Sequence, residues 1–155
     1  MAWTNSKVFV SLLSGGLGGS KFQLQATGSS GDTIKAALYN NSITPDNTVS
    51  ATNSAYNVGQ WANTNEVISS TQWPAGGVQI AQSVSTATTT FTFTASNTAS
   101  GTPATISGAY GTLVYDTTVS SYGICYNYFG GSQSVTAGTF TIAWNASGIA
   151  SFSVA

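Results

Sequence analysis

The chain contains no histidine and no arginine, and its 155 residues include only 3 lysines, 4 acidic residues and 1 cysteine. Histidine is the commonest general base in enzymes, and arginine is the side chain that holds carboxylate or phosphate groups through two parallel hydrogen bonds. Only 5% of the residues are charged, against about 25% in ordinary soluble domains. These absences argue against an enzyme, so we expect no catalytic residues and no cofactor.

The shortage of charge and of cysteine also limits the partners of the protein. Binding to nucleic acid depends on clustered cations, and three lysines spread over the first 35 residues cannot form a basic stripe. No run of about 18 apolar residues is present, as a membrane-spanning helix would require. The start of the chain lacks the basic and long apolar regions of a secretory signal, and the single cysteine excludes an internal disulfide. We therefore expect neither a nucleic-acid partner nor a membrane.

Apolar and neutral polar residues alternate along much of the chain, which is typical of β-strands. In the stretch TIKAALY, Ile34, Ala36 and Leu38 share one face. Lys35 lies on the other face, where we expect it to mark the solvent side and to prevent unwanted edge pairing. The following residues, NNSITPD, are strong turn formers. This pattern predicts a half-buried strand that runs into a polar turn.

Six further strands are predicted along the rest of the chain. They are GVQIAQSV, TTTFTFTA, YGTLVY, YGICYNYF, GTFTIAW and IASFSV, at residues 77–84, 88–95, 110–115, 122–129, 138–144 and 149–154. The last two flank NASG, a short loop in which Gly148 is available for a positive φ. Such strands predict an all-β fold, a compact β-sandwich or jelly-roll-like domain. We expect residues 1–155 to form one domain, since a chain of this length buries about 70% of its surface.

The N-terminal segment does not follow the alternating pattern. Thr4 or Asn5 is placed to cap a helix whose apolar side ends at the glycine-rich stretch SGGLGGS. The β-branched Val8 and Val10 also fit a strand. We expect residues 1–20 to form an N-terminal arm with one short helix. The glycine-rich stretch is a turn and not a phosphate loop, because its serine precedes the lysine where a Walker motif has the reverse order.

The few residues that carry chemistry have simple structural roles. A catalytic carboxylate pair would have to come from Asp32, Asp46, Glu66 and Asp116. We expect Asp32 to begin a strand, Asp46 and Asp116 to lie in turns, and Glu66 to lie in the polar middle of the chain. Cys125 lacks a histidine or cationic neighbour, so we expect a buried structural thiol. A calcium site at Asp46 would lack the spacing of an EF-hand loop, and zinc would need clusters of histidine or cysteine, so we expect no metal site.

Aromatic residues remain as the candidate site. We expect four of them on predicted strands to fill the core: Tyr126, Tyr128, Phe140 and Trp144. Four others lie outside the clearest strands: Trp3, Tyr56, Trp61 and Trp73. These either pack over the end of the core or form a partner interface, since exposed aromatic side chains anchor protein interfaces. The interface is our working prediction for these four residues.

Several sequence elements, taken in order, resemble a group of small tailed-bacteriophage virion proteins. The elements are DTIKAALYNNSITPD, NEV, WPAGGV, GTLVYD, ICYNYFGG and TAGTFTIAWNASGI. In that group a strand of the type D-T-x-K-x-A-L precedes a T-P-D turn, and the chain closes with F-T-I-x-W-x-A-x-G-I. The resemblance covers about Asp32 to Val154, and the N-terminal MAWTNSKVF also fits. It implies a phage structural component with no catalytic residues to carry over.

The leading expectation is therefore a capsid decoration protein that binds the outer surface of the assembled phage head. Its partners would be the major capsid protein and further copies of itself, in a homotrimer at threefold positions. The protein would be made in the cytoplasm of the host bacterium and located in the virion. The alternative is a tail or fibre-associated module that contacts the host surface. An envelope-degrading hydrolase is disfavoured by the missing histidine and arginine.

Overall fold

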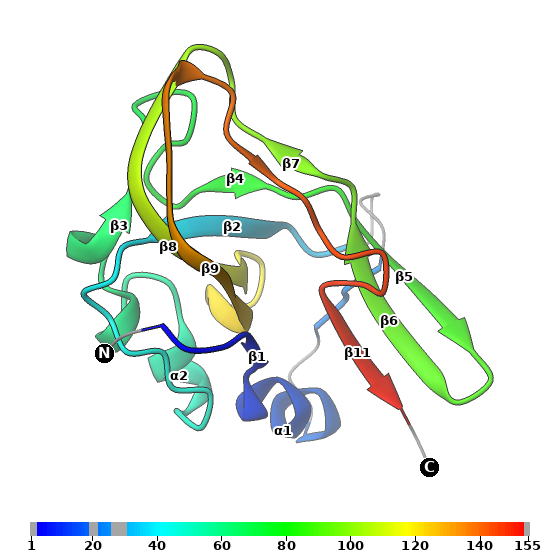
Figure 1. Ribbon diagram of the computed structural model, residues 1–155. Helices are drawn as coiled ribbons and strands as arrows, with labels where there is room; N and C mark the ends of the chain where they lie inside the picture. Colours follow the sequence, from blue (N-terminus) through cyan, green and yellow to red (C-terminus); the bar gives the residue numbers. More distant parts are fainter. Residues whose placement is uncertain (1–2, 19–21, 26–30, 154–155) are drawn as a thin grey trace.

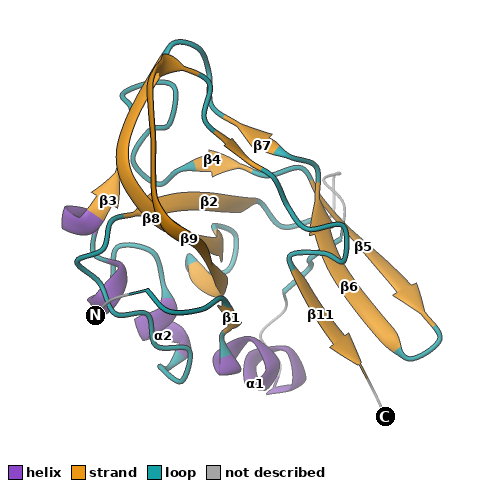
Figure 2. Cartoon of the chain, viewed as in Figure 1, coloured by secondary structure: helices purple, strands orange, loops and turns teal. Residues whose placement is uncertain are grey.

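The computed structural model describes residues 3–18, 22–25 and 31–153, which form an all-β, sandwich-like domain with short helices (Figures 1 and 2). The strands are β1 Lys7–Val8, β2 Ile34–Tyr39, β3 Glu66–Val67, β4 Val78–Gln79, β5 Gln82–Ala87, β6 Thr90–Ala95, β7 Thr98–Ala99, β8 Ala104–Asp116, β9 Tyr122–Gly138, β10 Thr141–Ile142 and β11 Ala150–Ser153. The helices are α1 Val10–Gly18 and α2 Ala51–Ser54, with 3-10 turns η1 Gly59–Trp61 and η2 Asn63–Asn65. The predicted fold class is confirmed.

The strands form three antiparallel sheets. The largest has the order β1-β9-β8-β2-β3, and β4 also pairs with β2. A second sheet has the order β11-β6-β5, and β10 pairs with β7 in a short third sheet. In Figure 1 the β11-β6-β5 sheet extends to the lower right, away from β2, β8 and β9. The chain passes from the large sheet to this second sheet between β4 and β5. Residues 77–84, GVQIAQSV, were predicted as one strand and therefore belong to two.

β2 lies inside the large sheet and is buried on both faces. Ile34, Ala36 and Leu38 are buried on one face, as the alternation predicts. Ala37 and Tyr39 are equally buried on the other face, so the prediction of a half-buried strand is wrong. The reason is tertiary: aromatic side chains from other segments, among them Trp3 and Trp61, cover this second face.

Lys35 consequently does not guard a sheet edge. It is half-buried within β2 and pairs in register with Tyr115 of β8 and Gln79 of β4. The prediction of a solvent-facing lysine on an edge strand is wrong because both neighbouring positions are taken by other strands.

Two hydrophobic clusters cover the two faces of β2. The first is mainly aliphatic and includes Ile34, Ala36, Leu38, Ile80, Phe93, Val114, Ile124 and Ile142. The second is mainly aromatic and consists of Trp3, Phe9, Ala37, Tyr39, Ile43, Trp61, Leu113, Tyr115 and Tyr126, with other residues at its margin. Alternate β2 residues contribute to each cluster, because successive side chains of a strand point to opposite faces.

The N-terminal segment contains both a strand and a helix. Val8 pairs with Cys125 in β1, and the helix begins only at Val10, so Thr4 and Asn5 precede a strand and do not cap the helix. The helix continues through the predicted stop at Gly15 to Gly18. Residues 1, 2, 19 and 20 of the predicted arm lie outside the described residues.

The C-terminal strands do not pair with each other across the NASG loop. β10 pairs with β7, whereas β11 pairs with β6. The loop therefore links two different sheets, and the Ile149 N–H donates to the Phe93 carbonyl at 2.7 Å as the chain enters β11. Gly148 has the predicted positive φ, at 98°.

Gly77 permits the chain to pass close to β2, and this contact can be tested. A Cβ atom added at Gly77 would lie 1.9 Å from the Ala36 carbonyl oxygen, whereas one added at Gly108 would meet no atom within 4 Å. Both glycines have a φ of +71°, so either alanine replacement carries a left-handed penalty of about 1–2 kcal/mol. We expect Gly77→Ala to lower the free energy of unfolding well beyond Gly108→Ala, measured by urea denaturation. Equal losses would contradict the close approach.

Candidate functional site

The tryptophan residues predicted to form an interface lie in the core. Trp3 is 4% exposed, and Trp61 and Trp73 are 0% exposed. Trp61 packs edge-on against Tyr39 with ring centroids 5.2 Å apart, and Trp73 packs edge-on against Phe140 at 5.7 Å. The interface prediction is therefore wrong for these three residues, because the segments outside the strands supply the layer that covers β2.

Tyr56, the fourth predicted interface residue, is half-buried within a polar network. Its ring stacks on Tyr115 with centroids 5.0 Å apart, and its hydroxyl donates to Glu66 at 2.8 Å. Glu66 also accepts from the Gly76 N–H at 2.8 Å. Burial is the main cause that raises the pKa of Tyr56 to about 12, followed by the hydrogen bond to Glu66. This network joins the loop between α2 and η1 to β3 and β8.

Asp32 and Asp116 form a buried acid pair at the point where β2 begins and β8 ends. Asp116 Oδ1 accepts from the N–H groups of Thr118 and Val119 at 2.7 and 3.1 Å, while its buried Oδ2 accepts from no donor. Asp32 accepts from the Gln23 N–H. Both carboxyl groups are buried at this junction, so a proton on one of them lowers the repulsion between the two acids.

Burial, and then the neighbouring Asp32 carboxyl group, raises the pKa of Asp116 to about 7. No lysine of the described residues contributes to this shift. The pair links the ends of two central strands, so we assign it a role in folding. The sequence offered no sign of it, because the two positions are far apart along the chain.

The remaining candidate residues have local partners. Asp46 Oδ1 accepts from the Thr48 N–H at 2.8 Å and from the Thr48 hydroxyl at 2.7 Å, in a turn as predicted. Cys125 is buried, and this burial raises its pKa to about 12, as a structural thiol requires. Within residues 3–18, 22–25 and 31–153, no three histidine, cysteine or acidic side chains gather as a metal site would need.

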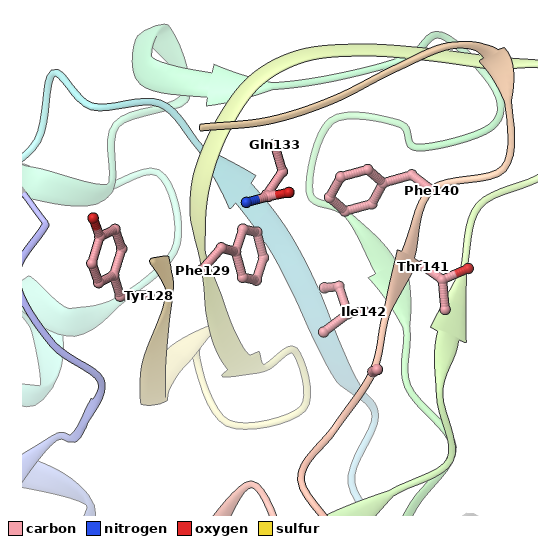
Figure 3. A pocket seen from close by; sticks show the side chains of 7 residues that line it. Tyr128, Phe129, Gln133, Phe140, Thr141 and Ile142 are labelled. Atoms are coloured by element: carbon pink, nitrogen blue, oxygen red, sulfur yellow. The ribbon is translucent and has the colours of Figure 1, made fainter. Parts of the chain in front are cut away.

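A groove runs beside β9, opposite the segment that contains β10 (Figure 3). One part, of about 390 Å³, lies between Phe129 and Gln133 of β9 and Phe140 and Thr141 of the opposite segment. The other part, of about 300 Å³, shares Phe129 and extends to Trp144. The two parts share Phe129 and therefore lie next to each other.

A bulge in β9 shapes this groove. Two steps along β8, from Ala109 to Gly111, correspond to five steps along β9, from Gln133 to Tyr128. The extra residues include Gly130, whose φ is +80°. β1 pairs with β9 only at residues 125 and 126, so none of the described strands covers that edge of β9 beside the bulge. Bulges of this kind re-aim side chains and end strand pairing.

Two aromatic residues predicted to fill the core line this groove. Tyr128 and Trp144 are only half-buried, whereas Tyr126 and Phe140 are buried as predicted. The Trp144 indole N–H donates to Thr98 Oγ1 at 2.9 Å, and the Tyr128 ring stacks on Trp3 with centroids 6.4 Å apart. Alternation alone could not separate these positions, since their exposure depends on the bulge.

Comparisons with protein-family models, with curated proteins and with solved structures found no match to the chain. No helix among the described residues has the length and apolar character needed to span a membrane.

Tryptophan quenching tests where the four indoles lie. Because Trp3, Trp61 and Trp73 are buried and Trp144 is half-buried, we expect acrylamide to quench only one component of the emission. Trp144→Phe should remove that component and leave the rest protected. Strong quenching in this variant would show that at least one of the other three tryptophans is exposed.

The acid pair predicts an unusual pH dependence of stability. Because the pKa of Asp116 rises from 3.8 to about 7 on folding, the folded state binds more protons than the unfolded state between these values. The free energy of unfolding should therefore fall as the pH rises from about 4 to about 7. Asp116→Asn keeps the acceptor oxygen and supplies an N–H donor to Asp32, so it should flatten this decline and be more stable than wild type at pH 8.

Asp46→Asn is the matched control for this measurement. The hydrogen bonds from Thr48 lower the pKa of Asp46, so its contribution changes only below about pH 4. Glu66, whose pKa is raised by burial, contributes in the same direction as Asp116 and remains in both variants. Thermal melting between pH 5 and pH 8 should show the decline in Asp46→Asn. An unchanged decline in Asp116→Asn would contradict the assignment.

Proposed function

We propose that the protein is a structural component of a bacteriophage virion, a decoration protein that binds the outer surface of the assembled head. The series of sequence motifs that resembles phage virion proteins supports this class of protein. In the fold, DTIKAALY contains β2, GTLVYD ends β8, and ICYNYFGG lies within β9. The resemblance thus involves the three central strands of the domain.

The observation that carries the proposal is the charge-free sheet β11-β6-β5. Its strands read ASFS, TFTFTA and QSVSTA, without one charged residue. No strand of the described residues pairs with the outer edges of β5 and β11. Free proteins usually protect open edges with charge, proline or a covering segment, because such edges pair with other chains. An open, uncharged edge therefore fits a protein whose edge is covered by a partner in an assembly.

One face of this sheet is also suited to neutral contacts. In register, Ser85 lies opposite Thr92, and Thr92 lies opposite Ser151. The opposite face carries Phe93 and Ala150, which are buried in the core. Hydroxyl groups and strand edges give contacts through hydrogen bonds and shape, so attachment depends little on ion pairs or salt.

Attachment of this kind would explain how a small neutral domain strengthens a shell. A decoration protein that contacts several capsid subunits adds interface area that must be lost before the shell can expand or rupture. The proposed partners are the major capsid protein and two further copies of this chain, in a trimer around a local threefold position. No catalytic step is assigned to the protein.

A tail or fibre-associated module is the second candidate. The groove beside β9 favours it, because a module that contacts the host needs a ligand site that faces solvent. The number of copies in each virion separates the two candidates. A decoration protein is present in proportion to the capsid protein, whereas a component of the tail tip is present in a few copies.

Binding to undecorated heads tests the proposed function. We expect purified protein to co-sediment with heads that lack it, in proportion to the capsid protein, and to remain bound as the salt concentration rises. Ser85→Lys should abolish binding, because it places a charge on the open edge strand β5. Asn41→Lys is the control. Asn41 lies in an exposed turn outside the β11-β6-β5 sheet, so this variant should bind normally. Release of the wild-type protein by moderate salt, or equal binding of both variants, would contradict the proposal.

A further inference from the structure

We propose that the groove beside β9 is a binding site for a neutral carbohydrate. This inference goes beyond attachment to the head and does not depend on it, because no residue of β5, β6 or β11 lines the part of the groove between Phe129 and Phe140.

The aromatic side chains of the groove are held in place before any ligand binds. Phe129 packs against buried Phe140 with ring centroids 6.3 Å apart. The Trp144 ring is held by its hydrogen bond to Thr98, whereas the Tyr128 ring stacks on Trp3 and points away from Phe129 (Figure 3). Fixed rings lose little conformational entropy on binding. A sugar ring has an apolar C–H face that fits such flat surfaces, while its hydroxyl groups need polar neighbours.

Neutral polar groups are present beside these rings. Gln133, Thr141 and Asn145 line the groove and are exposed. A side-chain amide both donates and accepts hydrogen bonds, as a hydroxyl does, so these groups match the hydroxyl groups of a sugar. The side-chain oxygen of Asn145, Oδ1, accepts from the Ser147 N–H at 2.8 Å, which orients the side-chain amide.

The charge and shape of the groove narrow the ligand class. No charged side chain is among the described residues that line either part, so a phosphate, sulfate or uronic acid group would find no cation there. Volumes of about 390 and 300 Å³ lie at the lower end of the usual range for ligand sites, about 300–1,000 Å³. Two neighbouring parts of this size suit an oligosaccharide that has one sugar unit in each part.

An extended peptide is the competing occupant, since part of the β9 edge is uncovered. Peptides add to sheet edges through a regular series of backbone hydrogen bonds. The bulge interrupts that series next to Phe129. Within the bulge, Gly130 and Gly131 have positive φ angles, +80° and +156°, unlike residues of a regular strand. The geometry therefore favours a ligand held by side chains over one held by backbone pairing.

Saturation-transfer NMR and tryptophan fluorescence test this site with defined probes. The neutral probes are cellohexaose, maltohexaose and chitohexaose, and the anionic probe is polygalacturonate. We expect at least one neutral probe to bind at millimolar concentration or below and to change the emission of Trp144. Trp144→Phe should remove the emission change, since the other tryptophans are buried.

A double variant tests the polar contacts. Gln133→Ala with Thr141→Ala replaces two exposed side chains and should weaken sugar binding about tenfold, which corresponds to about 1.4 kcal/mol. Gln79→Ala with Thr89→Ala changes the same residue types at exposed positions elsewhere and should bind normally. Ser85→Lys should retain sugar binding even where head binding is lost, so failure of one proposal is distinguishable from failure of the other.

Three results would overturn the carbohydrate site. They are the absence of binding by all three neutral probes, equal weakening in the two double variants, and binding of polygalacturonate alone. Saturation transfer to a hexapeptide of alternating threonine and valine, with none to the sugars, would also overturn it in favour of strand pairing.

Discussion

The burial of β2 on both faces is the constraint on which the rest of the structure depends. A strand covered on both faces needs two layers of side chains, and this chain has neither a disulfide nor a network of charges to hold such layers in place. The strands themselves supply much of the aliphatic layer. The aromatic layer also contains Trp3 and Trp61, which lie outside the strands and far apart in the sequence. Large rings suit this purpose, since each buries a large area at a small entropic cost.

Alternation of apolar and polar residues was sufficient to predict the fold class, β2, β6 and the cores of β8 and β9. It could not predict which aromatic residues are exposed. Trp61 lies in a 3-10 turn, where no periodic pattern indicates a buried face, and its burial follows from contact with Tyr39 across the fold. Tyr128 lies on a predicted strand, but the bulge that follows it opens a groove. A bulge depends on how two strands pair, and the sequence of one strand does not predict that pairing.

The sequence also could not predict that Asp32 and Asp116 would form a buried acid pair. Asp32 was predicted to begin a strand and Asp116 to open a turn; Asp32 lies two residues before β2, and Asp116 is the last residue of β8, before the turn. Their contact arises only because β2 and β8 pair with Ile34 opposite Asp116. In a chain with abundant arginine and lysine, such a pair is usually neutralised by a cation. Here no cation is among the causes that shift the pKa of Asp116, and burial together with Asp32 raises that pKa and favours the neutral form of the carboxyl group.

Low charge has opposite consequences for the two surfaces considered as sites. On the open edges of β5 and β11, it removes the usual protection against pairing, so these edges suit permanent contact with another chain. In the groove beside β9, it leaves aromatic rings, amides and a hydroxyl, which bind neutral polar ligands reversibly. No residue of β5, β6 or β11 lines the part of the groove between Phe129 and Phe140, so that part stays accessible when the edges of β5 and β11 are covered. A domain built in this way can be fixed within an assembly through one surface while the groove still binds a soluble ligand.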